Sequence, residues 1–350
     1  MSKKSAFKKR ESKENSAKKS ESKKAKKNSA ADSPVDSAPA IHENRVCIIG
    51  CGNVGMASAF ALLQSELVRE LVLIDRDAAK AEGEAMDLQQ AIAVPLEPPV
   101  KVTAGNYKDA AASAVVVVTA GVATSDPAVS RLELLGKNVK IIHEIVGKLK
   151  AENFRGILIM TTNPVDVLAQ VAQKESGLPP ARVISTGTVI DTARLRVLLA
   201  EELGIEPRAV DAYIIGEHGD SEIAVWSAAR IAGLPLAKFP GADKLPSEVE
   251  LLTRVREAAP EIVKRKGNTC YAIGMSVRRI CEAILRNERT ALSVSTLLQG
   301  EYGIEGVYLG TPCIVGKNGV EQIIELDLNV AERKGLQKSA DIQRRSVEEL

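Results

Sequence analysis

The feature that most constrains the fold is a series of short apolar runs that alternate with helix-like segments. Five such runs, rich in valine, isoleucine and leucine, occupy residues 45–50, 70–75, 100–105, 114–121 and 156–162. Runs that are apolar throughout, rather than at every second position, are typical of parallel strands covered on both faces. We therefore predict an α/β fold built on a doubly wound parallel sheet, the Rossmann arrangement.

The pattern changes after Asn163-Pro164. Helices flank a single short apolar run at 182–186, and a Lys-Asn-Gly turn at 317–319 separates two strand-like segments before a charged C-terminal helix. The expected helices before that last one span residues 165–176, 189–203 and 247–286. We predict a cofactor domain over residues 45–186 and a second, mixed α+β substrate domain over residues 187–350.

The first 44 residues have a different composition. Residues 1–40 carry twelve Lys or Arg against five Asp or Glu, a net charge of +7, whereas the remainder carries −5. Phe7 and Val35 are too few large apolar side chains to form a core, so we expect a disordered basic tail. Its charge also suits nucleic acid or an anionic membrane. The low aromatic content (3%) and the acidic body argue against contact with nucleic acid.

Cysteine usage indicates a reducing compartment. The five cysteines are scattered, odd in number and form no C-x-x-C pair, which is typical of reduced thiols and not of disulfides or a zinc site. The chain shows no apolar run long enough to cross a bilayer and no secretory signal pattern. We expect a cytoplasmic protein without membrane contact and without a metal site.

The sequence G-C-G-N-V-G at 50–55 stands where the first apolar run gives way to a helix. Gly50 would permit a tight turn, Gly52 the approach of a pyrophosphate, and Gly55 close packing of helix and strand. Twenty residues after the last of these glycines, Asp75 ends the second run, where a carboxylate accepts hydrogen bonds from a ribose diol and repels a 2′-phosphate. The combination predicts NAD as the cofactor.

Three further residues are candidates for chemistry. Asp191 and Arg194 lie three positions apart and share one face of a predicted helix, although a surface salt bridge would look the same. His218 follows an apolar run and has glycines on either side of it, an unusual place for a packing histidine. Of the three histidines in the chain, it is the candidate for proton transfer.

These motifs, in their order and spacing, resemble the lactate/malate dehydrogenase family. The resemblance covers about residues 45 to 348 and rests on G-C-G-N-V-G, Asp75, T-A-G (119–121), T-T-N-P-V-D (161–166), D-T-A-R (191–194), G-E-H-G-D-S-E (216–222) and K-G-N-T (266–269). It implies an NAD-dependent oxidoreductase that interconverts a small 2-hydroxy acid and its 2-oxo acid.

The resemblance also implies a role for each catalytic residue. His218 corresponds to the proton donor to the substrate carbonyl oxygen, and Asp191 to the carboxylate that orients it. Arg194 corresponds to the arginine that grips the substrate carboxylate in two parallel bonds, which a lysine cannot copy. Arg131 corresponds to the arginine of a mobile loop that polarises the carbonyl once the loop closes.

Further positions follow from the same resemblance. Asn163 corresponds to an asparagine that contacts the substrate and positions the nicotinamide side, and Thr269 to a threonine lining the substrate pocket. The positions expected to contact NAD are Val54, Asp75, Lys80, Tyr107, Gly121, Val122 and Asn163, together with the three glycines of the motif.

The loop at 121–131 bears on substrate choice. Where the family usually carries glutamine for lactate or arginine for malate, this loop offers Thr124 or the neighbouring Ser125. Residues 122–130 contain no Lys or Arg, and Asp126 adds negative charge. Burying a second substrate carboxylate without a cation costs several kcal/mol. We therefore expect pyruvate and L-lactate as the substrate pair, with malate or another 2-hydroxy acid as the alternative.

The resemblance also bears on assembly. Many bacterial members of the family are tetramers activated by fructose bisphosphate through an arginine and a histidine at a subunit interface. Arg196 matches the arginine, but Asp211 stands in place of the histidine, and its carboxylate would repel a phosphate. We expect a homotetramer or dimer that the sugar bisphosphate does not activate.

Overall fold

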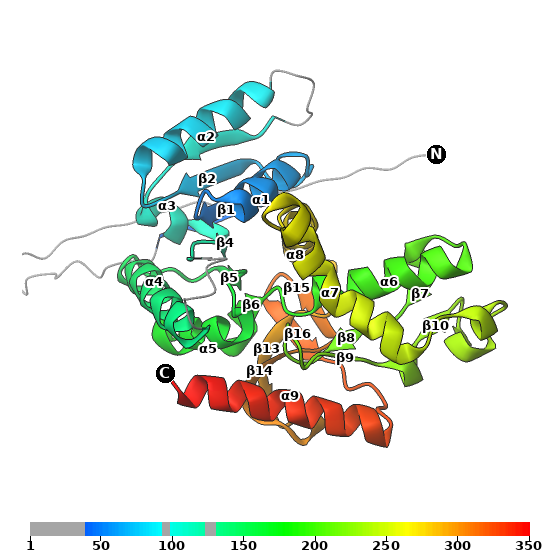
Figure 1. Ribbon diagram of the computed structural model, residues 1–350. Coiled ribbons are helices and arrows are strands. Elements are labelled where there is room, and N and C mark those ends of the chain that lie inside the picture. Colours follow the sequence, from blue (N-terminus) through cyan, green and yellow to red (C-terminus); the bar gives the residue numbers. More distant parts are fainter. Residues whose placement is uncertain (1–38, 93–98, 123–130) are drawn as a thin grey trace, which may run out of the picture. The chain divides into compact units, whose positions relative to one another are not determined.

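A parallel sheet forms the centre of the structure, as the apolar runs predict. The computed structural model describes residues 39–92, 99–122 and 131–350. Six parallel strands lie in the order β3-β2-β1-β4-β5-β6 (Figure 1). The order reverses between β1 and β4, the kind of switch point at which doubly wound sheets bind ligands. The strands are β1 (His42–Ile49), β2 (Glu70–Ile74), β3 (Lys101–Ala104), β4 (Ser113–Val118), β5 (Ile157–Met160) and β6 (Val183–Ser185).

Helices cover both faces of this sheet, which explains why its central strands are apolar at successive positions where they are buried. In β1, Val46 and Ile48 pack against one set of helices, and Cys47 and Ile49 pack against the other. The first set includes α1 (Asn53–Leu63) and α2 (Ala78–Ala91), and the second comprises α3 (Tyr107–Ala111), α4 (Arg131–Ala151) and α5 (Val165–Ser176). The predicted doubly wound fold is confirmed.

The C-terminal half contributes to the same sheet. Strands β13 (Ser295–Gln299) and β14 (Glu305–Gly310) extend it antiparallel beyond β6, with Ser295 paired to Ser185. Helix α8 (Tyr271–Leu285) lies beside α1 and adds Val277 and Ile280 to the core beneath (Figure 1). Residues beyond the predicted boundary at 186 therefore complete the cofactor sheet.

The remaining helices and strands belong to the C-terminal half of the chain. Helices α6 (Val189–Leu203) and α7 (Glu248–Lys266) pack on each other, and α9 (Val330–Glu348) packs against α5 and β14. The Lys-Asn-Gly turn joins β15 to β16 in a hairpin, as expected. The short strands form three small sheets: β7 (Val210–Asp211), β10 (Arg230–Ile231) and β11 (Leu234–Pro235); β8 (Ile214–Ile215) and β9 (Ile223–Ala224); β12 (Thr290–Leu292), β15 (Cys313–Gly316) and β16 (Gly319–Ile323).

Two segments differ from the sequence-based prediction. The region 247–286 is not one helical stretch, because α7 ends at Lys266 and is capped by Gly267, whose φ of 86° is left-handed and suits a glycine C-cap. The basic tail was predicted to extend to residue 44, but β1 begins at His42, whose backbone N donates to Ala112 O at 2.8 Å. Residues 1–38 of the predicted tail lie outside the described residues.

Across residues 39–92, 99–122 and 131–350, none of the helices is both long enough and apolar enough to cross a bilayer.

Candidate active site

The glycine loop after β1 packs tightly against the loop after β4. Gly50 has a φ of 111°, and a Cβ there would lie 2.5 Å from Ala120 N. A Cβ at Gly55 would lie 1.9 Å from the Gly50 carbonyl oxygen, so α1 approaches the turn this closely only with glycine at that position. Gly52 faces open space, with no described atom within 4 Å of its Cβ position. The fold therefore needs Gly50 and Gly55, whereas Gly52 leaves room for a pyrophosphate at the helix N-terminus.

Asp75 is held beside this loop at the end of β2. Its Oδ2 accepts a hydrogen bond from Cys51 N at 2.7 Å, and its Oδ1 accepts one from Asp77 N at 3.0 Å. These bonds orient the half-buried carboxylate, whose remaining lone pairs can accept from a ribose diol. Asp77 caps α2 by accepting from Lys80 N at 3.2 Å, which places the exposed Lys80 in the first turn of that helix.

A buried asparagine that was not predicted from the sequence joins the loops after β4 and β5. Asn138 Nδ2 donates to Val122 O at 3.2 Å and to Asn163 O at 2.9 Å, and its Oδ1 accepts from Val122 N at 2.7 Å. Since Asn138 is only 1% exposed, these bonds fix two backbone segments predicted to bind ligands. Gly121 packs just as closely, because a Cβ there would lie 2.2 Å from Thr162 Cγ2. The available signal was a lone asparagine on the apolar face of its helix.

The predicted cofactor positions follow the carboxyl ends of neighbouring strands. Asp75 follows β2, Tyr107 begins the helix after β3, Gly121 and Val122 follow β4, and Val54 stands in the first turn of α1. A helix N-terminus for phosphate and a preoriented carboxylate for ribose fit a dinucleotide.

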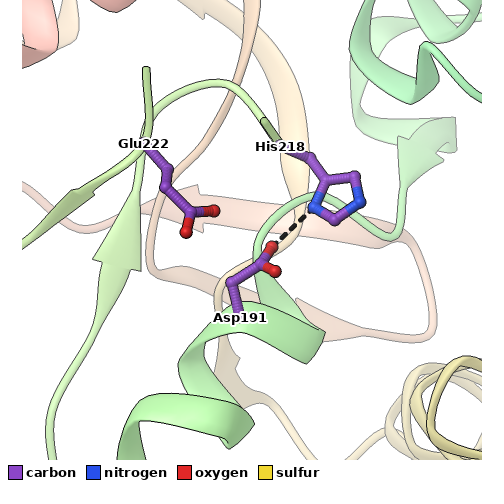
Figure 2. Close-up of side chains that lie close together, drawn as sticks. All are labelled: Asp191, His218 and Glu222. Atoms are coloured by element: carbon purple, nitrogen blue, oxygen red, sulfur yellow. Dashed lines mark hydrogen bonds and ion pairs between the residues drawn. The ribbon is translucent and has the colours of Figure 1, made fainter. Parts of the chain in front are cut away.

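His218 and Asp191 form a close pair at the start of α6. His218 Nδ1 lies 2.6 Å from Asp191 Oδ2 (Figure 2). Arg194 Nη1 donates to Asp191 Oδ1 at 2.8 Å. The Asp191 side chain is 2% exposed. Burial alone would raise the pKa of Asp191, but the adjacent His218 and Arg194 cations outweigh burial and lower it. With Nδ1 engaged by this carboxylate, Nε2 is the nitrogen that can exchange a proton with a substrate.

The surroundings of His218 favour its protonated form. Burial disfavours the imidazolium, but the carboxyl groups of Asp191, Asp166 and Glu222 outweigh this and raise the pKa of His218 to about 9. His218 is therefore a cation at neutral pH, which is the form a proton donor needs.

A second buried carboxyl group fixes the backbone of His218. Asp166 Oδ2 accepts from His218 N at 2.8 Å, and Asp166 Oδ1 accepts from Ser185 Oγ at 3.1 Å. Burial raises the pKa of Asp166 to about 6, although the bonds it accepts oppose this. Asp166 belongs to the T-T-N-P-V-D motif, but no role was predicted for it.

A cavity of about 320 Å³ adjoins the His218–Asp191 pair. It brings together three of the predicted catalytic and substrate residues with Asn163. Its lining consists of Leu134, Leu135, Asn163, Pro164, Asp191, Arg194, His218, Gly219, Asp220, Glu222, Arg256, Ala259 and Pro260. A guanidinium and an imidazolium thus line one pocket together with apolar side chains, which suits a small anionic carbonyl compound.

Three predicted substrate or catalytic residues are not placed around this cavity. Thr124 lies outside the described residues. Arg131 is the first residue of α4, and its side chain also lies outside the description. Thr269 is half-buried in the turn between α7 and α8 and does not belong to the described lining.

Three charged residues without a predicted role line the same cavity, namely Asp220, Glu222 and Arg256. Glu222, at the end of G-E-H-G-D-S-E, is 2% exposed, and its carboxyl group is turned toward Asp191 (Figure 2). Arg256 on α7 donates from Nη2 to the carbonyl oxygen of Glu222. Glu222 belongs to a motif that was recognised in the sequence, but no role was predicted for it. Arg256 could not be placed at the cavity from the sequence, because its position depends on how distant segments pack.

Asp191, His218 and Glu222 lie close enough together to be considered as ligands of a metal ion. One potential ligand atom from each of Asp191, His218 and Glu222 lies within 4.8 Å of the others. Asp191 already accepts hydrogen bonds from His218 and Arg194, and the Arg194 and Arg256 guanidinium groups would repel a cation. The donor set fits proton transfer better than metal binding.

Comparisons with known proteins agree with this geometry. Residues 44–185 match the family model for the lactate/malate dehydrogenase NAD binding domain, and residues 188–350 match that for the lactate/malate dehydrogenase alpha/beta C-terminal domain. The L-lactate dehydrogenase of Priestia megaterium is 48% identical over 301 residues, which cover 85% of this chain and 94% of that protein. An L-lactate dehydrogenase of Lactococcus lactis subsp. cremoris (strain NZ9000) is 46% identical over 313 residues, covering 89% and 99% respectively.

A solved structure shows the same arrangement. The ligand-bound crystal structure of the minor L-lactate dehydrogenase from Enterococcus mundtii matches with a TM-score of 0.84 at 41% identity, over 87% of this chain and 98% of that one. Two domain matches that together span most of the chain, and relatives of this similarity, show that the chain belongs to the lactate/malate dehydrogenase family and carries its NAD-binding domain.

Proposed function

We propose that this protein is an NAD-dependent L-lactate dehydrogenase that interconverts pyruvate and L-lactate. The observation that carries the proposal is one buried carboxylate, Asp191, bonded to both His218 and Arg194 at the wall of a single cavity. Its relatives from Priestia, Lactococcus and Enterococcus named above are L-lactate dehydrogenases, which supports the same activity here.

His218 is assigned the proton transfer. Bound reduced nicotinamide would supply the hydride for the carbonyl carbon. His218 donates from Nε2 the proton that the carbonyl oxygen needs. Asp191 stabilises the imidazolium and fixes the orientation of the ring through the 2.6 Å contact at Nδ1. Because negative charge on that oxygen develops only in the transition state, a cation aimed at it lowers the barrier. In the reverse direction, neutral His218 accepts the proton of the lactate hydroxyl.

Arg194 is assigned the grip on the substrate carboxylate. Its guanidinium lines the cavity and is held in place by Asp191 at 2.8 Å. Asn163, whose carbonyl accepts from Asn138, lines the same cavity and is assigned to the substrate and nicotinamide side. On the family resemblance, Arg131 is assigned to polarising the carbonyl.

The proposed pocket prefers a monocarboxylate. Residues 122–130, which include Thr124, supply no cation for a second carboxylate, and Asp126 would repel it. The alternative, a malate or other 2-hydroxy acid dehydrogenase, would draw on Arg256, a second guanidinium that lines the cavity. We favour pyruvate because Arg256 Nη2 is engaged by the Glu222 carbonyl and Arg256 Nε is buried.

Substrate profiling tests this proposal. NADH oxidation by purified protein is measured with pyruvate, oxaloacetate, 2-oxobutyrate and bulkier 2-oxo acids. We expect kcat/KM for pyruvate to exceed that for oxaloacetate by about 100-fold or more, since an unpaired buried carboxylate costs several kcal/mol. His218→Asn should abolish turnover with every substrate while NADH still binds. A higher kcat/KM with oxaloacetate would favour the malate assignment.

We further propose a cytoplasmic homotetramer or dimer. Large apolar side chains are exposed on the adjacent helices α1 and α8, namely Phe60, Tyr271 and Met275. Exposed apolar side chains on neighbouring helices are typical of a subunit interface. Light scattering coupled to size exclusion measures the mass of the assembly, and a monomer at micromolar concentration would contradict the proposal.

Activation by fructose bisphosphate is not part of the proposal. Arg196 Nη2 lies 3.6 Å from Asp211 Oδ1, and Arg196 Nε donates to Ala212 O at 3.0 Å. The Asp211 carboxylate therefore places a negative charge beside the arginine that a phosphate would need. Pyruvate saturation curves with and without the sugar bisphosphate should coincide. A sigmoidal curve that the bisphosphate makes hyperbolic would overturn this view.

A further inference from the structure

Glu222 is a buried charged residue to which the proposed mechanism gives no task. Its side chain is 2% exposed, and Oε1 has no hydrogen-bond partner within the part of the chain that the structure describes. An unpartnered carboxylate is costly to bury. Glu222 nevertheless lies within 4.8 Å of ligand atoms of His218 and Asp191, and Figure 2 shows the three side chains converging from different segments.

Charges of both signs surround this carboxyl group. Arg256 bonds the backbone carbonyl of Glu222 rather than its carboxyl group, and Arg256 Nε is also buried without a described partner. A hydrogen-bonded ion pair with Arg256 therefore does not fix the Glu222 charge. The titratable and charged groups that face the cluster are Asp166 on α5, Asp191 and Arg194 on α6, His218 and Asp220 in the segment between β8 and β9, and Arg256 on α7.

The protonation of Glu222 is linked to that of His218. Burial, and after it the charge of Asp191, raises the pKa of Glu222 to about 8, although His218, Arg256 and Arg194 oppose this. The pKa of His218 is about 9. Glu222 thus holds its proton at neutral pH, and both Glu222 and His218 lose their protons on the alkaline side. The ionised Glu222 carboxylate stabilises the imidazolium beside it, which raises the pH at which His218 loses its proton.

We propose that Glu222 is a positioning residue for His218, a buried carboxyl group whose charge beside the Asp191–His218 pair sets the alkaline limit of the reaction. This inference rests on the proposed function, because it assigns to His218 the proton that the reaction consumes. The electrostatic coupling between Glu222 and His218 can be measured without any turnover.

The test follows the titration of His218 directly. The chain has three histidines, so protein labelled with 13C-histidine gives few imidazole signals, and the His218→Asn variant identifies the one from His218. In Glu222→Gln, which keeps the shape and removes the charge, we expect the midpoint of His218 to fall by about one pH unit. The alkaline limb of kcat/KM for pyruvate reduction should move by the same amount. A merely structural role would lower activity at all pH values and leave the midpoint in place.

Glu217→Gln is the matched control. Glu217 is adjacent to His218 in the chain and similarly buried, at 5% exposed, but its Oε2 accepts a hydrogen bond from Ser221 Oγ, and the carboxyl groups that raise the pKa of His218 most are those of Asp191, Asp166 and Glu222. It should leave the His218 midpoint unchanged. If Glu222→Gln does not fold, Glu222→Asp withdraws the carboxyl group by one methylene and should shift the midpoint in the same direction by less.

The outcomes separate this inference from the proposed function. An unchanged His218 midpoint in a folded Glu222 variant, or an equal shift in Glu217→Gln, overturns the inference whatever the substrate is. A shifted midpoint in a protein that does not reduce pyruvate supports the coupling and refutes the proposed function instead.

Discussion

Replacing Asp191 by asparagine tests the electrostatic basis of the site. The substitution keeps the size of a side chain that is 2% exposed and removes the charge that bonds His218 at 2.6 Å and Arg194 at 2.8 Å. It therefore changes the protonation of His218 and the orientation of its ring. The two effects differ in their dependence on pH, so they can be separated.

The effect on protonation is large at alkaline pH. Burial by itself lowers the pKa of His218, and Asp191 is the largest of the contributions that raise it from 6.5 to about 9. Without that charge the pKa falls to its ordinary value or below. At pH 8 the protonated fraction then drops from roughly nine-tenths to roughly three-hundredths, about a 30-fold loss of the reactive form. At pH 6 both proteins remain mostly protonated, so this part of the loss nearly vanishes.

The loss of orientation is the same at both pH values. An asparagine amide holds the imidazole less firmly and also leaves Arg194 without its anion, which we expect to cost roughly 100-fold or more in kcat/KM. The assay is NADH oxidation with pyruvate at pH 6 and pH 8, with cofactor binding followed by fluorescence as the control for folding. The deficit of the variant at pH 8 should exceed its deficit at pH 6 by about 20-fold. Equal deficits at the two pH values would refute the assignment of the His218 charge to Asp191.

Three further predictions follow from the site. Gly55→Ala should lower the free energy of unfolding by about 3 kcal/mol, because its Cβ would lie 1.9 Å from a backbone oxygen. Gly52→Ala should leave urea unfolding unchanged. It should weaken NADH binding about tenfold, because its Cβ would occupy the open space proposed for the phosphates. Arg194→Lys should raise KM for pyruvate by roughly 100-fold, measured from initial rates, because an ammonium cannot form two parallel bonds to a carboxylate; an unchanged KM would contradict that role. Folded Glu222 holds its proton to about pH 8 while the unfolded chain releases it near 4.5, so the free energy of unfolding falls as pH rises between these values. Urea unfolding of Glu222→Gln at pH 5 and pH 8 should show a smaller fall than the unsubstituted protein, and the fall that remains comes from the raised pKa values of His218 and Asp166.

The sequence predicted those parts of the fold that local chemistry determines. Val46 to Ile49 are apolar in succession because alternate residues meet helices on opposite faces, and that pattern is visible without any partner. Gly50 and Gly55 were predicted from their spacing, and the structure shows contacts that exclude a Cβ at either. The pairing of β13 with β6 was not predicted, because it joins Ser295 to a residue far away in the chain and leaves no local signal.

In the candidate site too, residues in short motifs were predicted from the sequence, and residues positioned by distant segments were not. His218, Asp191 and Arg194 stand in short motifs, and the structure brings them together within one cavity. Asn138 and Arg256 lie in helices whose sequence shows only an amphipathic pattern. Their tasks arise from atoms of other segments, the carbonyls of Val122 and Glu222 respectively, so composition and spacing could not reveal them.

The antiparallel addition of β13 to β6 limits how this protein can be divided or recombined. A fragment that stopped after residue 186 would leave the backbone donors and acceptors of β6 unpaired along one edge and would strip α8 from α1. An uncovered edge of this kind recruits strands from other chains. The cofactor domain is thus not expected to be stable when it is separated from the rest of the chain. Chimaeras with relatives should exchange surface loops instead of whole domains.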